Sequence, residues 1–310
     1  MIRVVVPGLL TTVQDLGRPG LGALGVPRGG AADAHALRLG NLLLGNDEGA
    51  AALEATLSGP VLEFEEPAVL ALAGAPFAAT LDGAEVAPWS AVEARAGSRL
   101  DVGRAVSGAR AFVCVRGGLD VPPLLGSRST DVATGFGGLG GRPLAAGDRL
   151  PVGRTPGPPR GRRVDAAAAR WTGARRLLRV SAGAQEEWFA VETAEAFYAR
   201  PFRVSASSSR TGVRLEGEPL AAPARSLVTE GVVAGAVQVP PGGLPIILLV
   251  EHPSTGGYPK IASVISADLS ALAQLRPGDE VRFAKVSLDA ARLLLLEREA
   301  RLGAPGVFLR

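Results

Sequence analysis

Four glycine-containing loops carry most of the polar side chains that could bind or transform an anion. The first loop, residues 11–37, precedes an expected helix and holds six such side chains: Gln14, Asp15, Arg18, Arg28, Asp33 and His35. Long polar connections are common places for binding residues. We therefore interpret this loop as part of a site. The alternative is a polar loop tip in which Asp33 does no more than cap the helix.

The second loop, residues 124–144, places a cation among hydroxyl groups. Arg128 lies between Ser127 and Ser129, and Thr130 and Asp131 follow. This mixture suits an oxyanion or a carboxylate, and an aspartate there could orient a substrate or move a proton. An Asx or ST turn in a flexible glycine loop explains the same residues equally well.

Two further loops lie in the second half of the chain. In residues 207–217, SSSRTGVRLEG, Arg210 again follows serines. The segment EHPSTGGYPKIASVI, residues 251–265, contributes seven candidates: Glu251, His252, Thr255, Gly256, Gly257, Tyr258 and Lys260. Adjacent glycines let backbone N–H groups approach an anion, but the Gly-Lys-Ser/Thr end of a phosphate-binding P-loop is missing. Taken alone, this segment favours a strand, a loop and a second strand.

Together the four loops predict a site for an anionic substrate that works by positioning and charge stabilisation. We predict catalytic roles for Asp15, Asp33 and Asp131. We predict substrate contacts from a larger set: Gln14, Arg18, Arg128, Ser129, Thr130, Arg210, Glu251, His252, Thr255, Gly256, Gly257, Tyr258 and Lys260. The catalytic base is not singled out among them. With two histidines and one cysteine in the chain, no metal site is expected.

A recurring phrase predicts the elements that must position these loops. In RAGSRLDV, AAGDRLPV and RPGDEVRF a glycine and a Ser or Asp make a turn, and a strand follows. Further strands are expected at 3–6, 60–74, 109–118, 176–183, 235–251 and 260–266. Helices are few, at 32–45 behind Asp33, 186–199, and 287–303 behind Ser287. The chain is therefore expected to be mainly β.

Length and composition indicate two folded domains. The chain has 310 residues, of which 47% are hydrophobic and 20% charged. A stretch rich in Pro, Gly and Arg, residues 151–163, lacks apolar periodicity and is typical of a linker. We predict an N-terminal domain at 1–155, a linker at 156–164 and a C-terminal domain at 165–310.

Charge and apolar patterning exclude several function classes. The net charge is +3, with basic residues dispersed along the chain, so nucleic acid is not an expected partner. No apolar run is long enough to span a membrane and no export signal is visible, so we expect a cytoplasmic protein. Cys114 lies in an apolar strand-like run and is expected to be a buried, inert thiol.

Motifs along most of the chain resemble one family, the C subunit of 5-oxoprolinase, also called allophanate hydrolase subunit 2 or biotin-dependent carboxyltransferase-like. The motifs that carry the resemblance are GLLTTVQDLGRPG, GVPRGGAAD, ALEATLSGPVLEF, GSRSTD with GFGGL, EGVVAGAVQVPPGG, TGGYPKIASVISADL and LAQLRPGDEVRF. Two segments depart from the usual pattern. Residues 251–255 read Glu-His-Pro-Ser-Thr where many relatives read Asp-Arg-Gln-Thr-Thr, and residues 208–212 keep the arginine but lose a carboxylate.

The resemblance implies two cyclophilin-like β-barrel domains with a few short helices. It also implies a complex with the B and A subunits of 5-oxoprolinase, which opens 5-oxo-L-proline to L-glutamate at the expense of ATP. The B and C subunits would activate the lactam oxygen by phosphorylation, and the A subunit would hydrolyse the ring. The alternatives are a carboxyltransferase component of a biotin-dependent urea or amide carboxylase, or a non-enzymatic regulatory module that binds the B subunit. No biotin-attachment motif occurs, since Met1 is the only methionine.

Overall fold

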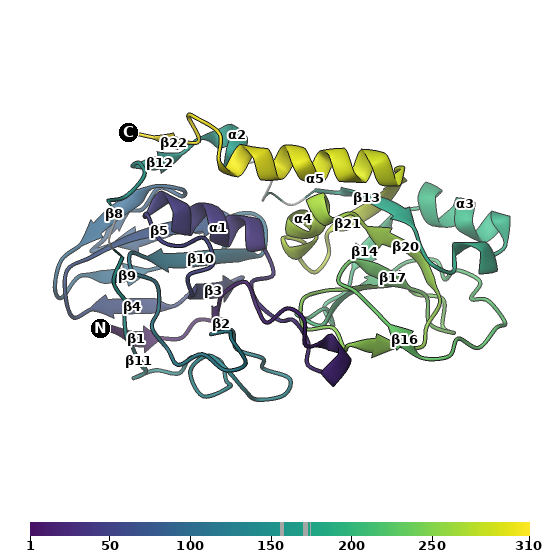
Figure 1. Ribbon diagram of the computed structural model, residues 1–310, viewed down its shortest axis with the longest axis horizontal. Coiled ribbons are helices and arrows are strands. Elements are labelled where there is room, and N and C mark those ends of the chain that lie inside the picture. Colours follow the sequence, from purple (N-terminus) through teal and green to yellow (C-terminus); the bar gives the residue numbers. More distant parts are fainter. Residues whose placement is uncertain (156–157, 170–172, 174) are drawn as a thin grey trace. The chain divides into compact units, whose positions relative to one another are not determined.

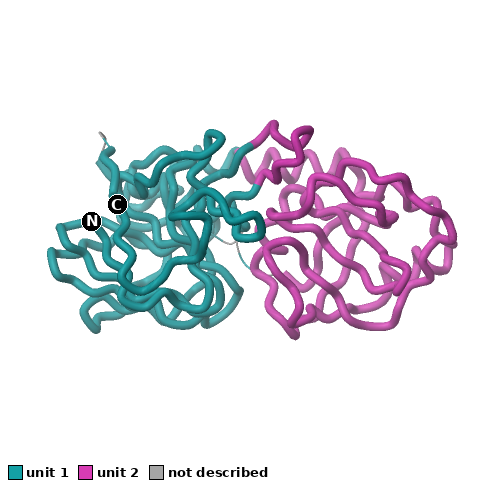
Figure 2. Tube along the Cα trace, turned by 90° about the horizontal axis from the view of Figure 1, so that it is seen from below, with its two compact units in different colours: residues 1–18, 29–173, 300–310 teal, residues 19–28, 174–299 magenta. Residues whose placement is uncertain are grey.

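The protein forms two compact units. The computed structural model describes residues 1–155, 158–169, 173 and 175–310. Unit 1 comprises Met1–Arg18, Gly29–Gly173 and Ala300–Arg310, and unit 2 comprises Pro19–Arg28 and Ala174–Glu299 (Figure 2). Strands dominate the described residues, which confirms the expected mainly β fold (Figure 1). Residues 156 and 157 of the predicted linker lie outside the described residues.

Most strands of unit 1 form two antiparallel sheets. The first has the order β11-β1-β4-β9-β6-β7, with β1 at Ile2–Val6, β4 at Val61–Phe64, β6 at Thr80–Leu81, β7 at Ala84–Glu85, β9 at Arg99–Asp101 and β11 at Arg149–Leu150. The second has the order β2-β3-β10-β5-β8, with β2 at Leu10–Gln14, β3 at Ala52–Thr56, β5 at Ala68–Gly74, β8 at Ala91–Ala94 and β10 at Arg110–Val115.

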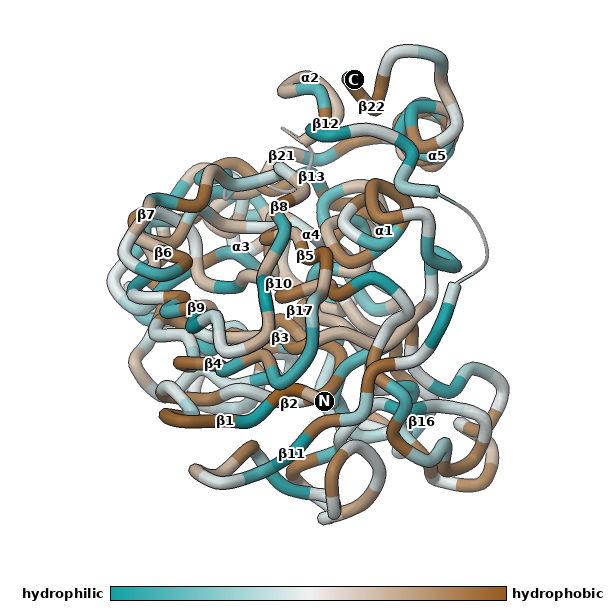
Figure 3. Tube along the Cα trace, turned by 90° about the vertical axis from the view of Figure 1, so that its left-hand side faces the viewer, coloured by the Kyte–Doolittle hydropathy of each residue, from teal (hydrophilic) through white to brown (hydrophobic). Residues whose placement is uncertain are grey.

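Strand β10 shows why the second sheet is apolar on both faces. Val113 and Val115 belong to the core shared with β1 and β4, whereas Phe112 and Cys114 belong to a second core beneath helix α1, Ala34–Leu43. Successive side chains of a strand point to opposite faces, so a strand with two covered faces needs a continuous apolar run. The hydropathy of the strands can be followed in Figure 3. Burial raises the pKa of the Cys114 thiol to about 12, and the expected inert thiol is confirmed as buried.

Unit 2 is built around a closed barrel with the order β13-β20-β17-β18-β15-β14-β21. Its strands are β13 at Leu177–Ala182, β14 at Phe202–Val204, β15 at Gly212–Glu216, β17 at Ala236–Gln238, β18 at Ile246–Leu248, β20 at Lys260–Val264 and β21 at Glu280–Lys285. Helix α3, Val191–Ala199, packs on the barrel through Phe197, whose ring stacks on Phe283 with centroids 4.4 Å apart. The single helix expected at 186–199 is instead a 3-10 turn, Glu186–Trp188, and α3, because Phe189 and Ala190 are extended.

The recurring glycine phrase forms the same turn three times. Gly97, Gly147 and Gly278 all have positive φ, and β9, β11 and β21 begin two residues after them. In each turn the following Ser or Asp accepts a backbone N–H from three residues earlier, as when Arg95 N donates to Ser98 Oγ at 3.0 Å. The side chain thus fixes the turn that aligns the strand, as the sequence predicts.

The C-terminal segment returns to unit 1. Strand β12, Arg163–Val164, pairs with β22, Phe308–Leu309, and Val307 packs in the core under α1. The short helix α2, Ala166–Ala169, follows β12 in the chain, and the long helix α5, Leu288–Leu302, precedes β22. Ser287 is the N-cap of α5, as expected. The C-terminal residues 300–310 therefore fold with unit 1 and not with the segment expected to form one C-terminal domain.

The close packing of α1 on the second sheet predicts a penalty for Gly40→Ala. A methyl group at Gly40 would lie 2.7 Å from Cys114 Sγ and 2.8 Å from Ala73 Cβ. Alanine gains about 1 kcal/mol in helix propensity, but overpacking costs about 1–3 kcal/mol, so we expect a net loss of stability. Urea unfolding followed by circular dichroism measures it. Gly303→Ala is the control, since nothing lies within 4 Å of that position; a stabilised Gly40→Ala variant would contradict the packing.

Candidate functional site

The carboxylate of Asp15 organises the candidate site in unit 1. Asp15 follows β2 and is 9% exposed. Its Oδ1 accepts hydrogen bonds from Ser127 Oγ at 2.6 Å, Ser129 Oγ at 2.5 Å and Gly17 N at 2.7 Å, and its Oδ2 accepts one from Arg128 N at 2.6 Å. A carboxylate with four donors is held in one orientation. This geometry favours a positioning role for Asp15 over the catalytic role that the sequence predicts.

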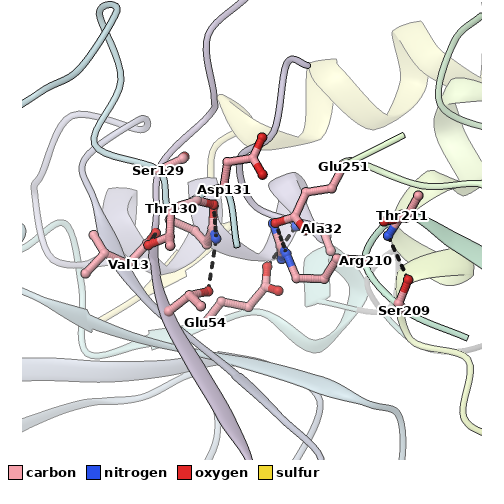
Figure 4. Close-up of polar contacts among 12 residues, drawn as sticks. Val13, Ala32, Glu54, Ser129, Thr130, Asp131, Ser209, Arg210, Thr211 and Glu251 are labelled. Carbon is pink, nitrogen blue, oxygen red and sulfur yellow. Dashed lines mark hydrogen bonds and ion pairs between the residues drawn. The ribbon is translucent and has the colours of Figure 1, made fainter. Parts of the chain in front are cut away.

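The loop after Leu124 is joined to β2 along its length. Thr130 N and Thr130 Oγ1 both donate to Val13 O, and Gln14 Nε2 donates to Thr130 O at 3.1 Å. Ser129 and Thr130 are fully buried, and neither presents a surface hydroxyl. Figure 4 shows Val13 beside Thr130. Ser129 and Thr130, which the sequence predicts to contact a substrate, therefore hold the loop in place.

Arg18 is a buried cation with open donors. Its side chain is 2% exposed, its Nη2 donates to Ser129 O at 2.6 Å, and its guanidinium carbon lies 4.7 Å from the centre of the Phe136 ring. Among the described residues its Nε and Nη1 have no hydrogen-bond partner. Burial lowers the pKa of Arg18 from its usual value, and the nearby charges of Asp15 and Asp131 act in the opposite direction. The residue keeps its charge at neutral pH because arginine starts from a very high pKa.

Asp131 supplies an open acceptor in the same unit. It is fully buried, begins a turn that closes back from Phe136, and its Oδ1 accepts Thr134 N at 3.1 Å. Its Oδ2 has no hydrogen-bond partner among the described residues, and neither has Gln14 Oε1. Asp131 attracts Arg18 electrostatically. The site thus presents open donors and open acceptors.

Glycines allow this close arrangement. A methyl group on Gly137 would lie 2.9 Å from Arg18 Nη2, and one on Gly138 would overlap Thr130 Oγ1. Both residues have positive φ, which disfavours any side chain there. The motif GFGGL therefore closes the loop over the buried arginine.

Other predicted residues of unit 1 have structural contacts. Asp33 is the N-cap of α1 and its Oδ1 accepts Ala36 N at 3.0 Å. Arg128 Nε donates a hydrogen bond to Val121 O, and Arg128 Nη2 forms an ion pair with Asp120 Oδ1 at 2.9 Å. The side chain of Arg128 is 38% exposed. This arrangement directs the positive charge of Arg128 toward Asp120.

The sequence analysis missed Glu54, Arg110 and Phe136. Glu54 is 1% exposed on β3, its Oε2 accepts Ala32 N at 2.8 Å, and its Oε1 lies 3.6 Å from Arg110 Nε. A signal was present, because a lone glutamate in the apolar run ALEATL is unusual for a buried strand. Phe136 carried no signal, since its contact with Arg18 depends on the tertiary fold.

The remaining predicted residues lie in unit 2, where Arg210 and Lys260 belong to two separate polar clusters. Arg210 and Glu251 form a buried ion pair, with Nε 2.6 Å from Oε1 (Figure 4). His252 Nδ1 contacts Pro253 O, and Thr255, Gly257 and Tyr258 are exposed. Lys260 of the barrel strand β20 lies in a separate polar cluster with Glu230, and Gly256 pairs with Glu230 in a two-stranded sheet beside the barrel. Arg28 and the short 3-10 turn Gly22–Leu24 also belong to unit 2, so the first polar loop is divided between the units.

The described part of the chain holds no group of three or more His, Cys, Asp or Glu residues arranged to bind a metal ion. In the same residues, no helix combines the length and apolar character needed to cross a bilayer.

Comparison with known proteins assigns the family. A family model described as carboxyltransferase domain, subdomain A and B, matches residues 24–285. The chain belongs to this carboxyltransferase family. It is 41% identical to the C subunit of 5-oxoprolinase from Escherichia coli K12 over 297 residues, which covers 94% of this chain and 93% of that protein. The similarity to the 5-oxoprolinase C subunit that the motifs indicate is therefore confirmed.

The family also includes parts of larger proteins. The chain is 34% identical over 321 residues to urea amidolyase of Saccharomyces cerevisiae, covering 94% of this chain and 17% of that protein. The crystal structure of K. lactis urea amidolyase matches with a TM-score of 0.90 at 32% identity, covering all of this chain and 20% of that one. One fold therefore serves both as a separate chain and as a segment of a multidomain protein.

Asp15→Asn tests the role of the central carboxylate in this carboxyltransferase family member. The amide would present N–H groups to donors that now meet an oxygen, so we expect a loss of about 1–3 kcal/mol in unfolding free energy. Amide hydrogen exchange at residues 127–131 should also accelerate. Asp120→Asn is the matched control, because that carboxylate is 60% exposed and its ion pair contributes little. Equal effects of the two substitutions would contradict the organising role of Asp15.

Proposed function

We propose that this chain is a subunit of an ATP-dependent 5-oxoprolinase complex that converts 5-oxo-L-proline to L-glutamate. The observation that carries the proposal is the buried set of open groups in unit 1, Nε and Nη1 of Arg18 with Oδ2 of Asp131. The relatives named as the C subunit of 5-oxoprolinase, of nearly the same length, support it. The complex would be cytoplasmic, with the B and A subunits of 5-oxoprolinase as partners.

The substrate matches the open groups in kind. 5-Oxo-L-proline offers a carboxylate and a lactam oxygen as acceptors and one lactam N–H as a donor. Arg18 can donate through Nε to one acceptor oxygen and through Nη1 to another, on different edges of the guanidinium. Asp131 Oδ2 or Gln14 Oε1 can accept the lactam N–H. The charges of Arg18 and Asp131 are thereby satisfied by the same small molecule.

The same contacts would assist activation of the lactam. Phosphorylation of the lactam oxygen by ATP transfers the γ-phosphoryl group to that oxygen and releases ADP. The oxygen gains nucleophilicity as the N–H is held by a carboxylate, and Arg18 stabilises negative charge that develops on the transferred group. A buried arginine is effective here because charges interact more strongly away from water.

A second candidate function is carboxyl transfer to urea or a related amide. The likeness to urea amidolyase of two yeasts favours it. Urea also combines a carbonyl acceptor with N–H donors, so the open groups of unit 1 would suit it. Carboxybiotin would have to come from another chain or domain. Activity with urea, biotin carboxylase and carrier, and none with 5-oxo-L-proline, would select this function.

The proposal predicts that the complete mixture of the three subunits forms L-glutamate from 5-oxo-L-proline only with ATP and this chain present. Arg18→Met should lower kcat/KM by about 10²–10³-fold, the usual cost of removing a charge-stabilising donor. Asp131→Asn should lower it at least about tenfold, because the amide replaces an accepting oxygen by a donor. Coupled detection of ADP and glutamate gives both rates.

Arg149→Lys is the control for these variants. Arg149 is 59% exposed and paired with Glu65, so its substitution should leave the rate unchanged. Circular dichroism and unfolding curves establish that each variant is folded. An unchanged rate when this chain is omitted would refute the function, whereas full activity of folded Arg18→Met would refute only the site.

A further inference from the structure

Lys260 is an unusual residue for this chain. Of the 33 basic residues, only Lys260 and Lys285 are lysines and all others are arginines. Lys285 is exposed on β21 and paired with Glu186 at 2.7 Å, whereas Lys260 is 7% exposed in the barrel of unit 2. Lysine is a compact, strongly hydrated charge, and burying it is costly without a partner. A buried lysine in an arginine-rich chain thus points to a specific partner.

Gln238 lies directly beside Lys260. The two residues are opposite each other in the register of β17 and β20, which places their side chains on the same face. Gln238 is 6% exposed. Neither Gln238 Nε2 nor Lys260 Nζ has a hydrogen bond of ordinary geometry among the described residues. Two buried donors therefore lie side by side with unused capacity.

A carboxylate from outside the barrel contacts Lys260. Glu230 belongs to a two-stranded flap of β16, Glu230–Gly231, and β19, Thr255–Gly256. Its Oε1 lies 2.5 Å from Lys260 Nζ and accepts Gln185 Nε2 at 3.0 Å. These two contacts, that of Lys260 first, lower the pKa of Glu230 below its usual value. Glu230 is 41% exposed, so its carboxylate can leave the lysine and be solvated by water.

Gly256 places the flap in close contact with Gln238. A methyl group on Gly256 would lie 2.6 Å from Gln238 Nε2 and 3.1 Å from Val232 Cγ1. The flap therefore covers Gln238 closely, although Glu230 makes no hydrogen bond with it. An internal carboxylate thus meets one of the two donors and leaves the other unused.

We propose that Lys260 and Gln238 form a binding site for a small carboxylate, and that Glu230 is an internal competitor which the ligand displaces. One oxygen of the ligand would replace Glu230 Oε1 at Lys260 Nζ, and the other would accept Gln238 Nε2. The ligand then satisfies Lys260 and Gln238, whereas Glu230 satisfies Lys260 and Gln185. Displacement therefore exchanges the hydrogen bond of Gln185 for one from Gln238. Release of Glu230 detaches the flap, so binding is coupled to its opening. The site uses only unit 2 residues and does not depend on the proposed function.

The two lysines make the test direct. The full chain is labelled with [13Cε]lysine, and its two Cε–Hε NMR signals are assigned with Lys285→Arg. Sodium acetate is titrated at constant ionic strength, with acetamide as the uncharged comparison. We expect a saturable shift of the Lys260 signal with acetate alone and an unmoved Lys285 signal. Parallel shifts of both signals, or none, would overturn the site.

Variants separate the competitor from the site. Glu230→Gln should tighten acetate binding about two- to fivefold, because a partly exposed ion pair is worth a factor of this size. Gln238→Leu should weaken it about two- to tenfold through loss of one hydrogen bond. Glu186→Gln, which removes the carboxylate next to Lys285, is the matched control and should have no effect. Unchanged or weaker binding to folded Glu230→Gln would overturn the competition, whatever the 5-oxoprolinase assay shows.

Discussion

The four hydrogen bonds to the Asp15 carboxylate are the constraint on which the site of unit 1 depends. Three of them join the end of β2 to residues 127–129, more than a hundred positions later in the chain, and the fourth comes from Gly17 N. Ser129, held in this way, presents its carbonyl oxygen to Arg18. The buried cation is thus placed by backbone and hydroxyl groups that Asp15 orders. A polar network of this kind is effective only when each member has its partner.

Two arginines illustrate how burial divides structural from functional roles. Arg128 is paired with the exposed Asp120, so water screens the ion pair and its contribution to stability is small. Arg18 lies under the glycine loop against Phe136, with part of its guanidinium without a partner among the described residues. Burial without full compensation is costly to folding. A bound acceptor would offset this cost, which is why we assign the anion to Arg18.

Much of the fold could be predicted from local patterns. The three glycine turns and the Asp33 cap rest on residues within a few positions of each other. Long apolar runs were less informative, since the runs expected as single strands at 60–74 and 235–251 each form two strands. Contacts between distant segments, such as Phe136 with Arg18 or Glu230 with Lys260, have no local signature. They are set by the tertiary fold, which a single sequence does not reveal.

The measurement that tests the central claim most directly is a crystal structure of this chain with 5-oxo-L-proline in the assembled complex. The account predicts ligand oxygens within hydrogen-bond distance of Arg18 Nε or Nη1, and the lactam N–H on Asp131 Oδ2 or Gln14 Oε1. A ligand bound elsewhere, with these atoms still facing only protein, would contradict it.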